Sequence, residues 1–387
     1  MDEPPGRLPA ASLPSSEATS TRSPSISPDS RDWPQRSLAY QFLPFRGIYT
    51  DIRNRLPFYL SDWTEGFKPS NFQRVAGATV RIFFLNIFPM LAYIIDMNVR
   101  TGGSYGVNEG ILASAIAALT FAVFSVQPLT IVGDVGIIYI QKGIELLVYE
   151  FDGGRGQAGW FSVVVAILFA LSAYFVERAG TLSFGPFWLR KFIVDYAFAA
   201  VIIFYTGFVH IPGYIKDSDI QYLPITKAFA PTLDRDWVVP FWNLPVKWVF
   251  VALPFGCLNN VSSLMAQSRG FPVKRPAGFH WDFFLLGLTT FVSGIIGLPA
   301  PNGLVPQAPV HTEALCETKV VPEETEVSEG GFYEGDMKGL KRERSDREMG
   351  GGGMKIVRTR LVEQRVSHFA MGASFSSSAG APSRGAG

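Results

Sequence analysis

Long apolar runs separated by short polar segments occupy the middle of the chain, from about residue 75 to residue 315. The clearest run, residues 75–97, is long enough as a helix to cross a bilayer, which takes about 20 residues. Further apolar runs occupy residues 111–126, 160–176, 192–209 and 279–298. The run at residues 248–257 is too short, because a spanning helix needs roughly 17 residues or more. The pattern predicts an all-α polytopic membrane protein.

Two apolar runs are interrupted by proline, glycine and amide side chains. The first break, residues 124–133, contains Gln127, Pro128, Leu129 and Thr130; the second break, residues 297–309, contains Pro301, Asn302, Gly303 and Gln307. Proline removes a backbone donor and clashes with the preceding turn, so a helix should stop at Pro128 and at Pro299. Backbone groups freed inside a membrane cannot face lipid, so such breaks persist where they pack in protein or line a wet cavity. Because paired breaks are typical of transporter binding sites, we expect a substrate site between them.

The chain divides into four parts. Residues 1–42 are rich in Ser, Pro and Arg, which predicts a disordered leader exposed to the cytosol. Residues 43–74 repeat apolar positions at helical spacing between arginines, which predicts an amphipathic juxtamembrane segment; a short helix packed on the membrane domain is the other interpretation. The transmembrane domain covers residues 75–316. Residues 317–387 are charged and then rich in Gly and Ser, which predicts a polar, disordered tail.

Composition supports a membrane protein and argues against other classes. Charged residues make up 17% of the chain and hydrophobic residues 48%, whereas soluble domains carry roughly 25% charged residues. A formal charge of +1 supplies no basic face for nucleic acid. The two cysteines are far apart in the sequence, so neither a disulfide framework nor a zinc site is predicted. No nucleophile, phosphate-loop or metalloprotease motif occurs, so we expect no enzyme, no catalytic residue, no metal and no cofactor.

Ionisable residues near the apolar runs have two interpretations. Asp195 lies within a spanning run, where carboxylates are costly and often functional, although the basic pair just before it could neutralise it. His280 and Asp282 adjoin another run, and His311 lies within the chain that follows the second break. An interfacial position is favoured over a metal site for the two histidines, because the spacing supplies no converging ligands.

Several segments carry a more specific pattern: FSVQPLTIVG at residues 124–133, NVSSLMAQ at 260–267, GLPAPNGLVPQAPVHTEAL at 297–315 and VEQRVSHFAMG at 362–372. Together they resemble the bicarbonate-transporter family, in particular its fungal and plant borate exporter branch. The resemblance implies fourteen membrane segments in two inverted repeats of seven, with two half-helices that meet at an anion site. The binding residues it implies are Gln127, Pro128, Leu129, Thr130, Pro301, Asn302, Gly303 and Gln307. Backbone N–H groups of Leu129, Thr130 and Gly303 would hold the anion, amide and hydroxyl side chains would add hydrogen bonds, and the prolines would enforce the breaks.

The chain departs from the family pattern in three places. The fourth segment is missing after Gly133, and the eighth is short, with Leu258 near the place of a family carboxylate. Nothing apolar follows residue 372, where segments eleven to fourteen would lie. We therefore expect an incomplete version of the 7+7 inverted-repeat anion-transporter fold.

Three functional hypotheses follow. The principal one is transport of a small inorganic anion, borate efflux or bicarbonate exchange, by alternating access around the two half-helices in a plasma or vacuolar membrane. Its expected partners are the anion, the lipid bilayer and a second copy in a homodimer, and no nucleic acid. A different hypothesis is a non-transporting membrane fragment that lacks the gate half. Transport of nucleobases or sulfate is less favoured, because the GLPAPNG and PQAPVHTEAL segments resemble the borate branch.

Overall fold

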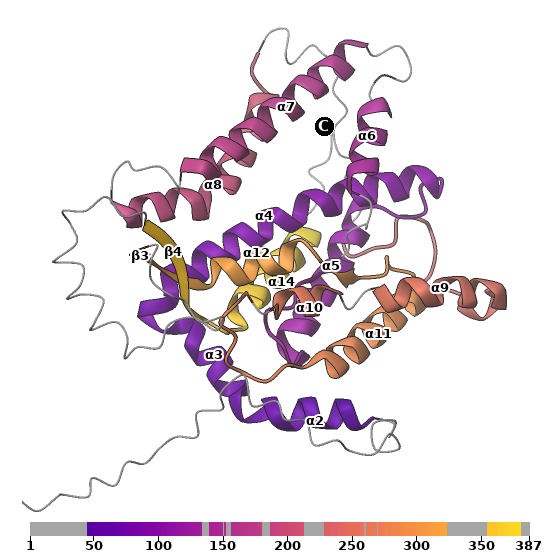
Figure 1. Cartoon of the computed structure of the whole chain (residues 1–387). Coiled ribbons are helices and arrows are strands. Elements are labelled where there is room, and N and C mark those ends of the chain that lie inside the picture. Colours follow the sequence, from indigo (N-terminus) through magenta and orange to yellow (C-terminus); the bar gives the residue numbers. More distant parts are fainter. Residues whose placement is uncertain are drawn as a thin grey trace, which may run out of the picture. The chain divides into compact units, whose positions relative to one another are not determined.

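The computed structural model describes residues 45–133, 139–149, 151, 156–179, 186–212, 228–258, 261–268, 270–322 and 354–380. Helices dominate these residues, with a few short strands (Figure 1). The helices are α2 Arg46–Arg55, α3 Tyr59–Phe67, α4 Pro69–Arg100, α5 Val107–Phe124, α6 Tyr139–Tyr149, α7 Gly156–Ala179, α8 Phe187–Phe208, α9 Val246–Leu258, α10 Val261–Ala266, α11 Phe279–Ile296, α12 Gln307–Ala314 and α14 Val366–Ala379, with 3-10 turns at Leu56–Phe58 and Phe241–Asn243. The strands are β1 Val132–Gly133, β2 Asn302–Gly303, β3 Cys316–Pro322 and β4 Met354–Leu361. The predicted helical class is confirmed.

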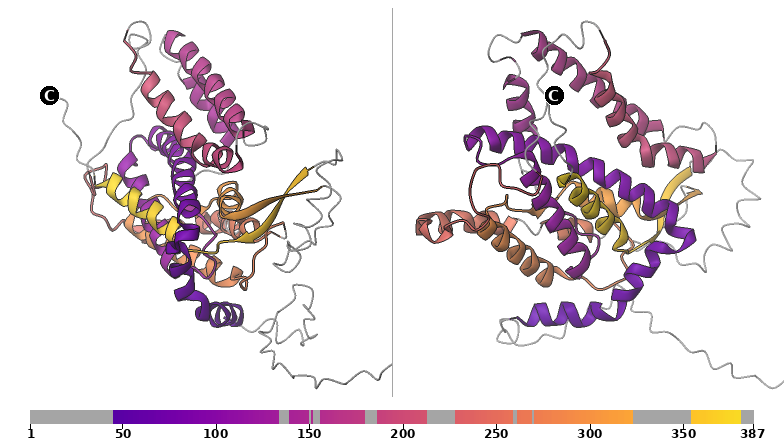
Figure 2. Two further views of the ribbon diagram at one scale, coloured as in Figure 1. Left: turned by 90° about the vertical axis from the view of Figure 1, so that its left-hand side faces the viewer. Right: turned by 180° about the vertical axis from the view of Figure 1, so that it is seen from behind.

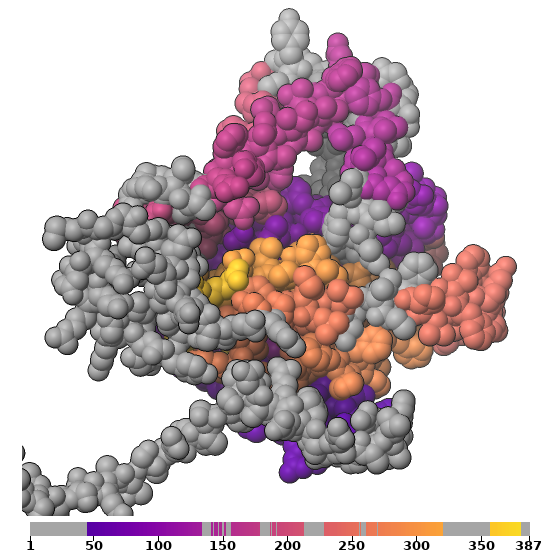
Figure 3. Space-filling view, in the orientation of Figure 1, coloured from indigo at the N-terminus to yellow at the C-terminus, as the bar shows by residue number. Residues whose placement is uncertain are grey.

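Five helices of the described residues are long and apolar enough to cross a membrane: α4, α5, α7, α8 and α11. They differ in burial, because the most apolar window of α5 is 67% buried and that of α7 only 6% buried. An apolar helix that exposes almost all of its surface is suited to contact with lipid. The short α9 likewise exposes every side chain that is described in it (Figure 3).

α5 lies at the centre of the core because its small side chains allow close approach on several sides. Ala113, Ala117 and Ala118 are all buried. α14 packs against α5 so closely that a Cβ atom on Gly372 would lie 3.0 Å from the backbone nitrogen of Leu119. α4 packs against both helices (Figure 2). The first break, which follows α5, is therefore set in the interior of the protein.

The stretch beyond residue 317 contains ordered structure that the sequence analysis did not expect. β3 and β4 pair antiparallel, with Cys316 opposite Leu361, and α14 follows. Met371 and Phe375 of α14 lie four residues apart and are both buried, so they form one apolar stripe. The surrounding Ser and Gly residues hide this stripe in the sequence. Residues 323–353 and 381–387 of the expected tail, and the leader at 1–42, lie outside the described residues.

Buried ion pairs, here called the arginine cluster, join the juxtamembrane helices to the segment before α14. Arg55 binds Glu363 at 3.0 Å and Asp62 at 3.2 Å. The Nε atom of Arg365 binds Asp62 at 3.2 Å, and Arg275 also donates to Asp62. The juxtamembrane segment thus buries charged side chains against the rest of the described chain. Such burial is tolerated because each charge has partners from another segment.

Candidate functional site

The two breaks lie side by side in the structure. β1 of the first break pairs antiparallel with β2 of the second, with Val132 opposite Gly303. The backbone N–H of Leu304 donates to the carbonyl oxygen of Ile131 at 2.9 Å. From α10, the hydroxyl of Ser262 lies 3.2 Å from the carbonyl oxygens of both Ile131 and Leu304. The short ladder and this side chain fix the two breaks to one another.

The pairing of β1 with β2 gathers the residues predicted for the site. Seven of them are buried there: Gln127, Pro128, Leu129, Thr130, Pro301, Gly303 and Gln307. Asn302 is partly exposed. The two groups of candidate residues thus flank one strand pair, and all of them except Asn302 are buried.

Backbone N–H groups at this junction have partners within the chain. Leu129 N–H donates to Oε1 of Gln127 at 3.3 Å, and Thr130 N–H donates to the backbone oxygen of Gln127 at 3.3 Å. Gly303 lies at the alternate position of the ladder, where the N–H points away from the partner strand. The expectation that Leu129 and Thr130 offer free N–H groups therefore does not hold in this structure. Side-chain atoms carry the unused hydrogen-bonding capacity instead.

Several buried polar atoms here lack a hydrogen-bond partner among the described residues. They include Nε2 of Gln127 and Oε1 of Gln307, whose residues are 0% and 5% exposed. His311 Nε2 lies 2.7 Å from the hydroxyl of Ser367, and the His368 residue is 0% exposed. Burial lowers the pKa of His368 to about 3, so its ring is neutral. A buried polar atom without a partner costs about 1–3 kcal/mol, so a small polar solute or water is the expected partner.

Asp282 contacts the first break from the first turn of α11. Its residue is 1% exposed, and its carboxylate accepts the backbone N–H of Val126 at 2.8 Å and of Gln127 at 3.3 Å. The hydroxyl of Thr130 also donates to it, at 3.4 Å. The sequence analysis noted Asp282 only as adjoining an apolar run, and the structure shows that it is buried. Its only sequence signal was a carboxylate just inside an apolar run, because its partners lie far away along the chain.

At each of the two helices that precede a break, an arginine from another segment binds carbonyl groups at the C-terminal end. Arg365 Nη1 donates to the carbonyl oxygen of Ala122 in α5 at 3.0 Å. Arg235 donates to the carbonyl oxygens of Ile296 at 3.2 Å and Gly297 at 2.9 Å, at the end of α11. Cations stabilise helix C-termini, where carbonyl groups lack partners. Burial lowers the pKa of Arg365 to about 10, which leaves it charged at neutral pH.

α5 and α11 are linked at both ends by acidic residues from their first turns. Glu109 in the first turn of α5 binds Arg235 at 3.0 Å, and Arg235 caps the end of α11. Asp282 in the first turn of α11 binds the break after α5. Each helix therefore helps to hold the break that follows the other. None of these three residues was predicted for the site.

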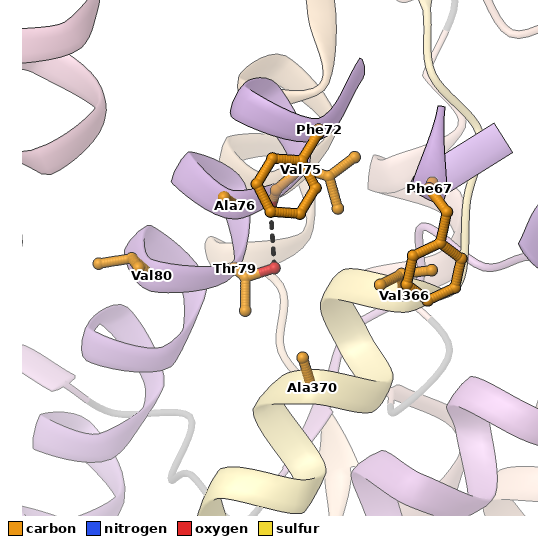
Figure 4. A pocket seen from close by; sticks show the side chains of 9 residues that line it. Phe67, Phe72, Val75, Ala76, Thr79, Val80, Val366 and Ala370 are labelled. Carbon is orange, nitrogen blue, oxygen red and sulfur yellow. Dashed lines mark hydrogen bonds between the residues drawn. The ribbon is translucent and has the colours of Figure 1, made fainter. Parts of the chain in front are cut away.

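Two pockets of about 280 Å³ each lie elsewhere on the protein. One lies between α4 and α14 and is lined mainly by apolar side chains, among them Phe72, Val75 and Val366 (Figure 4). Thr79 in its wall donates its hydroxyl to the carbonyl oxygen of Val75 at 2.7 Å, so the pocket offers little to a polar ligand. The other is lined by α4 and α8, and neither includes a residue of the breaks. Among the described residues, no three His, Cys, Asp or Glu side chains are grouped to hold a metal.

Comparison with known proteins identifies the class of protein. A family model described as the HCO3- transporter integral membrane domain matches residues 43–151 and 155–330. The chain belongs to the HCO3- transporter family and is an integral membrane protein, as its sequence segments predicted.

Curated relatives come from fungi, plants and animals. A putative transporter of Schizosaccharomyces pombe is 35% identical, over 84% of this chain and 71% of its own length. Boron transporter 1 of Saccharomyces cerevisiae is 36% identical, over 70% of this chain and 60% of its own length. Band 3 anion transport protein of Homo sapiens is 30% identical, over 70% of this chain and 40% of its own length.

The departures from the family pattern fall partly outside the described residues. Residues 134–138, where the fourth segment was expected to be missing, are among those not described. α9 has 13 residues, which agrees with a shortened eighth segment, and it ends at Leu258. The side chain of Leu258 and residues 259–260 are not described.

Proposed function

We propose that this protein transports a small inorganic anion, borate or bicarbonate, across a plasma or vacuolar membrane, with the substrate held at the junction of the two breaks. The observation that carries the proposal is the pairing of β1 with β2, which joins the two breaks, and the buried amides Gln127 and Gln307 flank this strand pair along the chain. Membership of the HCO3- transporter family supports it, as do relatives named as boron and anion transporters.

The proposed site binds through uncharged groups. Among the residues that the structure describes, Gln127 Nε2 is a donor without a partner, and no side chain caps the N-terminus of α12, the helix that follows the second break. The dipole at the start of α12 favours negative charge, although the N–H of Ala308 donates to the carbonyl oxygen of Leu304 and Pro309 has no N–H. Pro301, Asn302 and Gly303 precede α12, and Asn302 and Gly303 form strand β2. Neutral donors suit a transporter, because an ion held by full charges would leave the site slowly.

Alternating access would use the reciprocal links between α5 and α11. In an inverted repeat, each half supplies one broken helix to a site near the bilayer midplane. The contacts of Glu109 with Arg235 and of Asp282 with the first break support this arrangement for the two halves. The 7+7 repeat and assembly as a homodimer are parts of the same proposal, and the mass of the purified protein in detergent tests the latter.

Boron content tests the proposal in cells that lack their own boron exporter. Expression of the full chain should lower the boron content of cells grown in boric acid. Gln127→Ala should abolish most of this effect, because it removes the unpartnered donor, and Asn302→Ala should weaken it. Gln141→Ala is the control, since Gln141 is exposed and bonds to Glu145 at 2.8 Å. Unchanged boron content with the full chain present in the membrane would contradict the proposed function.

A further inference from the structure

The pocket between α4 and α14 is suited to hydrocarbon and lies apart from the two breaks (Figure 4). Its volume is about 280 Å³, and apolar side chains line most of it. The hydroxyl of Thr79 in its wall donates to the carbonyl oxygen of Val75 at 2.7 Å. Ala76 of α4 and Ala370 of α14 are small, which leaves room between the two helices. An apolar ligand leaves no polar group of this wall without a partner, whereas a polar ligand would lose its own hydrogen bonds there.

The rim of the pocket is aromatic and exposed. Phe67 of α3 is 65% exposed, and Phe72 of α4 is 62% exposed. Trp63 packs edge-on against Phe369, the residue before Ala370, with the ring centroids 5.6 Å apart. Tryptophan is enriched where a membrane meets water, because its ring lies at the depth of the head groups. The rim therefore fits a position near the surface of the bilayer.

The pocket lies where α4 enters the membrane. α4 has 32 residues and is about 48 Å long at the helical rise, which exceeds a hydrocarbon core of about 30 Å. Its apolar run begins at Val75, so the turn from Lys68 to Phe72 lies at the depth of the head groups. Phe72, Val75 and Thr79 are three or four residues apart and share one face of α4. Lys68 precedes this face by one turn.

Basic side chains outnumber acidic ones around Lys68. The carboxylate of Glu65 is shared by three of them: Lys68 at 3.5 Å, Arg275 at 3.6 Å, and Arg360. The Lys68 side chain is 54% exposed and has only a share of this carboxylate. By the positive-inside rule, such an excess of basic residues places this end of α4 on the cytosolic side. The cytosolic leaflet carries the anionic lipids of a membrane.

We propose that the pocket between α4 and α14 holds an acyl chain of an anionic phospholipid from the cytosolic leaflet, with the lipid head group at Lys68. The inference goes beyond the proposed function, because this site is separate from the two breaks. The acyl chain lies along Phe72, Val75 and Thr79, and the phosphate of the head group meets the ammonium of Lys68. Since α3, α4 and α14 all line the pocket, the bound lipid links the tail helix to the juxtamembrane segment.

Two substitutions test the acyl chain and the head group separately. Ala370→Phe places a ring in the pocket, so it should remove most of the lipid binding. Lys68→Gln keeps the stem of the side chain and removes its charge. It should lower the preference for an anionic over a neutral lipid about fivefold, the effect of one basic residue near an anionic surface.

Matched controls come from the second pocket and from α9. The pocket between α4 and α8 has the same volume, about 280 Å³, and no Lys or Arg adjoins its lining residues along the chain. Thr206→Phe fills this second pocket and should leave lipid binding at the first one unaltered. Lys247→Gln makes the same change of charge at an exposed residue of α9, whose ammonium lies 5.4 Å from the centre of the Trp248 ring.

The experiment is photo-labelling of the full chain in vesicles of phosphatidylcholine and phosphatidylserine. A trace of one or the other lipid carries a photoreactive group on its acyl chain, and mass spectrometry locates the label. The label should fall on the peptides that contain Phe72 and Ala370, and more of it should come from phosphatidylserine. Ala370→Phe should remove this label, Lys68→Gln should reduce the preference for phosphatidylserine, and both controls should retain label and preference.

Three results would overturn the inference. The first is a label spread evenly over the exposed apolar helices, and the second is a label at the pocket that persists in Ala370→Phe. The third is equal labelling by the two lipids in the unaltered chain, which removes the case for an anionic head group. If Ala370→Phe does not fold, the comparison of Lys68→Gln with Lys247→Gln decides. Each result leaves the proposed transport function standing, because none involves the residues of the breaks.

Discussion

The two breaks are alike in sequence, yet different side chains hold them. At the first break, one acidic and one basic side chain from distant segments bind the backbone. Asp282 accepts hydrogen bonds from N–H groups of the break, and Arg365 donates to a carbonyl oxygen of α5, the helix before it. At the second break, Arg235 meets the carbonyl groups that end α11, and no side chain caps the N-terminus of α12. The first break therefore depends on distant segments for both its donors and its acceptors. The second depends on Arg235 at the end of α11 and on a bond within the chain at the start of α12, where the N–H of Ala308 donates to the carbonyl oxygen of Leu304 at 3.1 Å.

This contrast shows how a broken helix is kept inside a membrane protein. Lipid cannot satisfy freed backbone groups, so each break needs polar partners from within the chain. At the first break these partners come from α11 and from the segment before α14. At the second they come from the loop that carries Arg235, from Ser262 of α10 and from Thr290 of α11. The loss of a capping side chain should therefore lower the free energy of unfolding more at the first break than at the second.

The largest effect is expected from Arg365→Met, at the first break. The Arg365 side chain is 1% exposed, and its loss leaves Asp62 short of a partner and the Ala122 carbonyl uncapped. Removing one member of a buried ion pair costs about 3–5 kcal/mol. The loss is checked by measuring the free energy of unfolding of the variant and of the unaltered protein in detergent. Arg358→Met is the control, because its ion pair with Glu313 is well exposed and should contribute less than about 1 kcal/mol.

Arg235→Met should weaken the second break by a smaller amount. Arg235 is 20% exposed, and Glu109 would keep its bonds to the N–H of Gly106 at 2.9 Å and to Thr232 at 2.6 Å. We expect a loss of about 2 kcal/mol, the worth of a charged hydrogen bond. The same unfolding measurement gives the comparison. A loss equal to or greater than that of Arg365→Met would refute the proposed difference between the breaks.

Gly297→Ala should destabilise the end of α11 by about 1–2 kcal/mol, because the site requires a left-handed backbone. Gly297 has a φ of 72°, and a Cβ atom there would lie 2.5 Å from Cγ1 of Val239. Gly294→Ala is the matched control, since nothing lies within 4 Å of a Cβ atom at that helical position. It should be neutral or stabilise by up to about 1 kcal/mol. Melting temperatures of the two variants separate these outcomes.

His368→Gln should change the pH dependence of stability near the first break. Burial lowers the pKa of His368 from 6.5 to about 3, so the folded protein binds fewer protons than the unfolded chain below pH 6.5. The free energy of unfolding is therefore highest above pH 6.5, and the contribution of His368 to it is lost as the pH falls toward 3. Between roughly pH 7.5 and 5.5 the loss is about 1 kcal/mol. If the melting temperatures of the variant and of the unaltered protein change equally with pH across this range, His368 does not contribute to the pH dependence of stability.

The sequence predicted those features that depend on local chemistry. α5 ends at Phe124 and α11 at Ile296, shortly before Pro128 and Pro299, and the amides Gln127 and Gln307 are buried. The partners of the breaks were not predicted, because Asp282 reaches its partner Val126 from far along the chain. The N–H groups of Leu129 and Thr130 were expected to hold the anion. In the structure they donate hydrogen bonds to the side-chain and backbone oxygens of Gln127.

The packed tail helix was missed because its signal is short. Only Met371 and Phe375, among small residues, mark the buried face of α14. Arg365 then looks like part of a polar segment, although it caps α5. Periodicity identifies long apolar helices well, whereas a charged residue that serves a distant helix end has no periodic mark.

A disulfide between the two breaks tests the central claim most directly. Val132→Cys and Gly303→Cys occupy a cross-strand pair without ladder hydrogen bonds, where Cα atoms are about 4.5 Å apart, within the range of a disulfide. With both native cysteines replaced, mild oxidation in membranes should link the halves of a chain cleaved between α8 and α9. Reduction should release them, and boron export should stop on oxidation and return on reduction. Halves that separate without reductant, although both cysteines react with maleimide, would contradict the account.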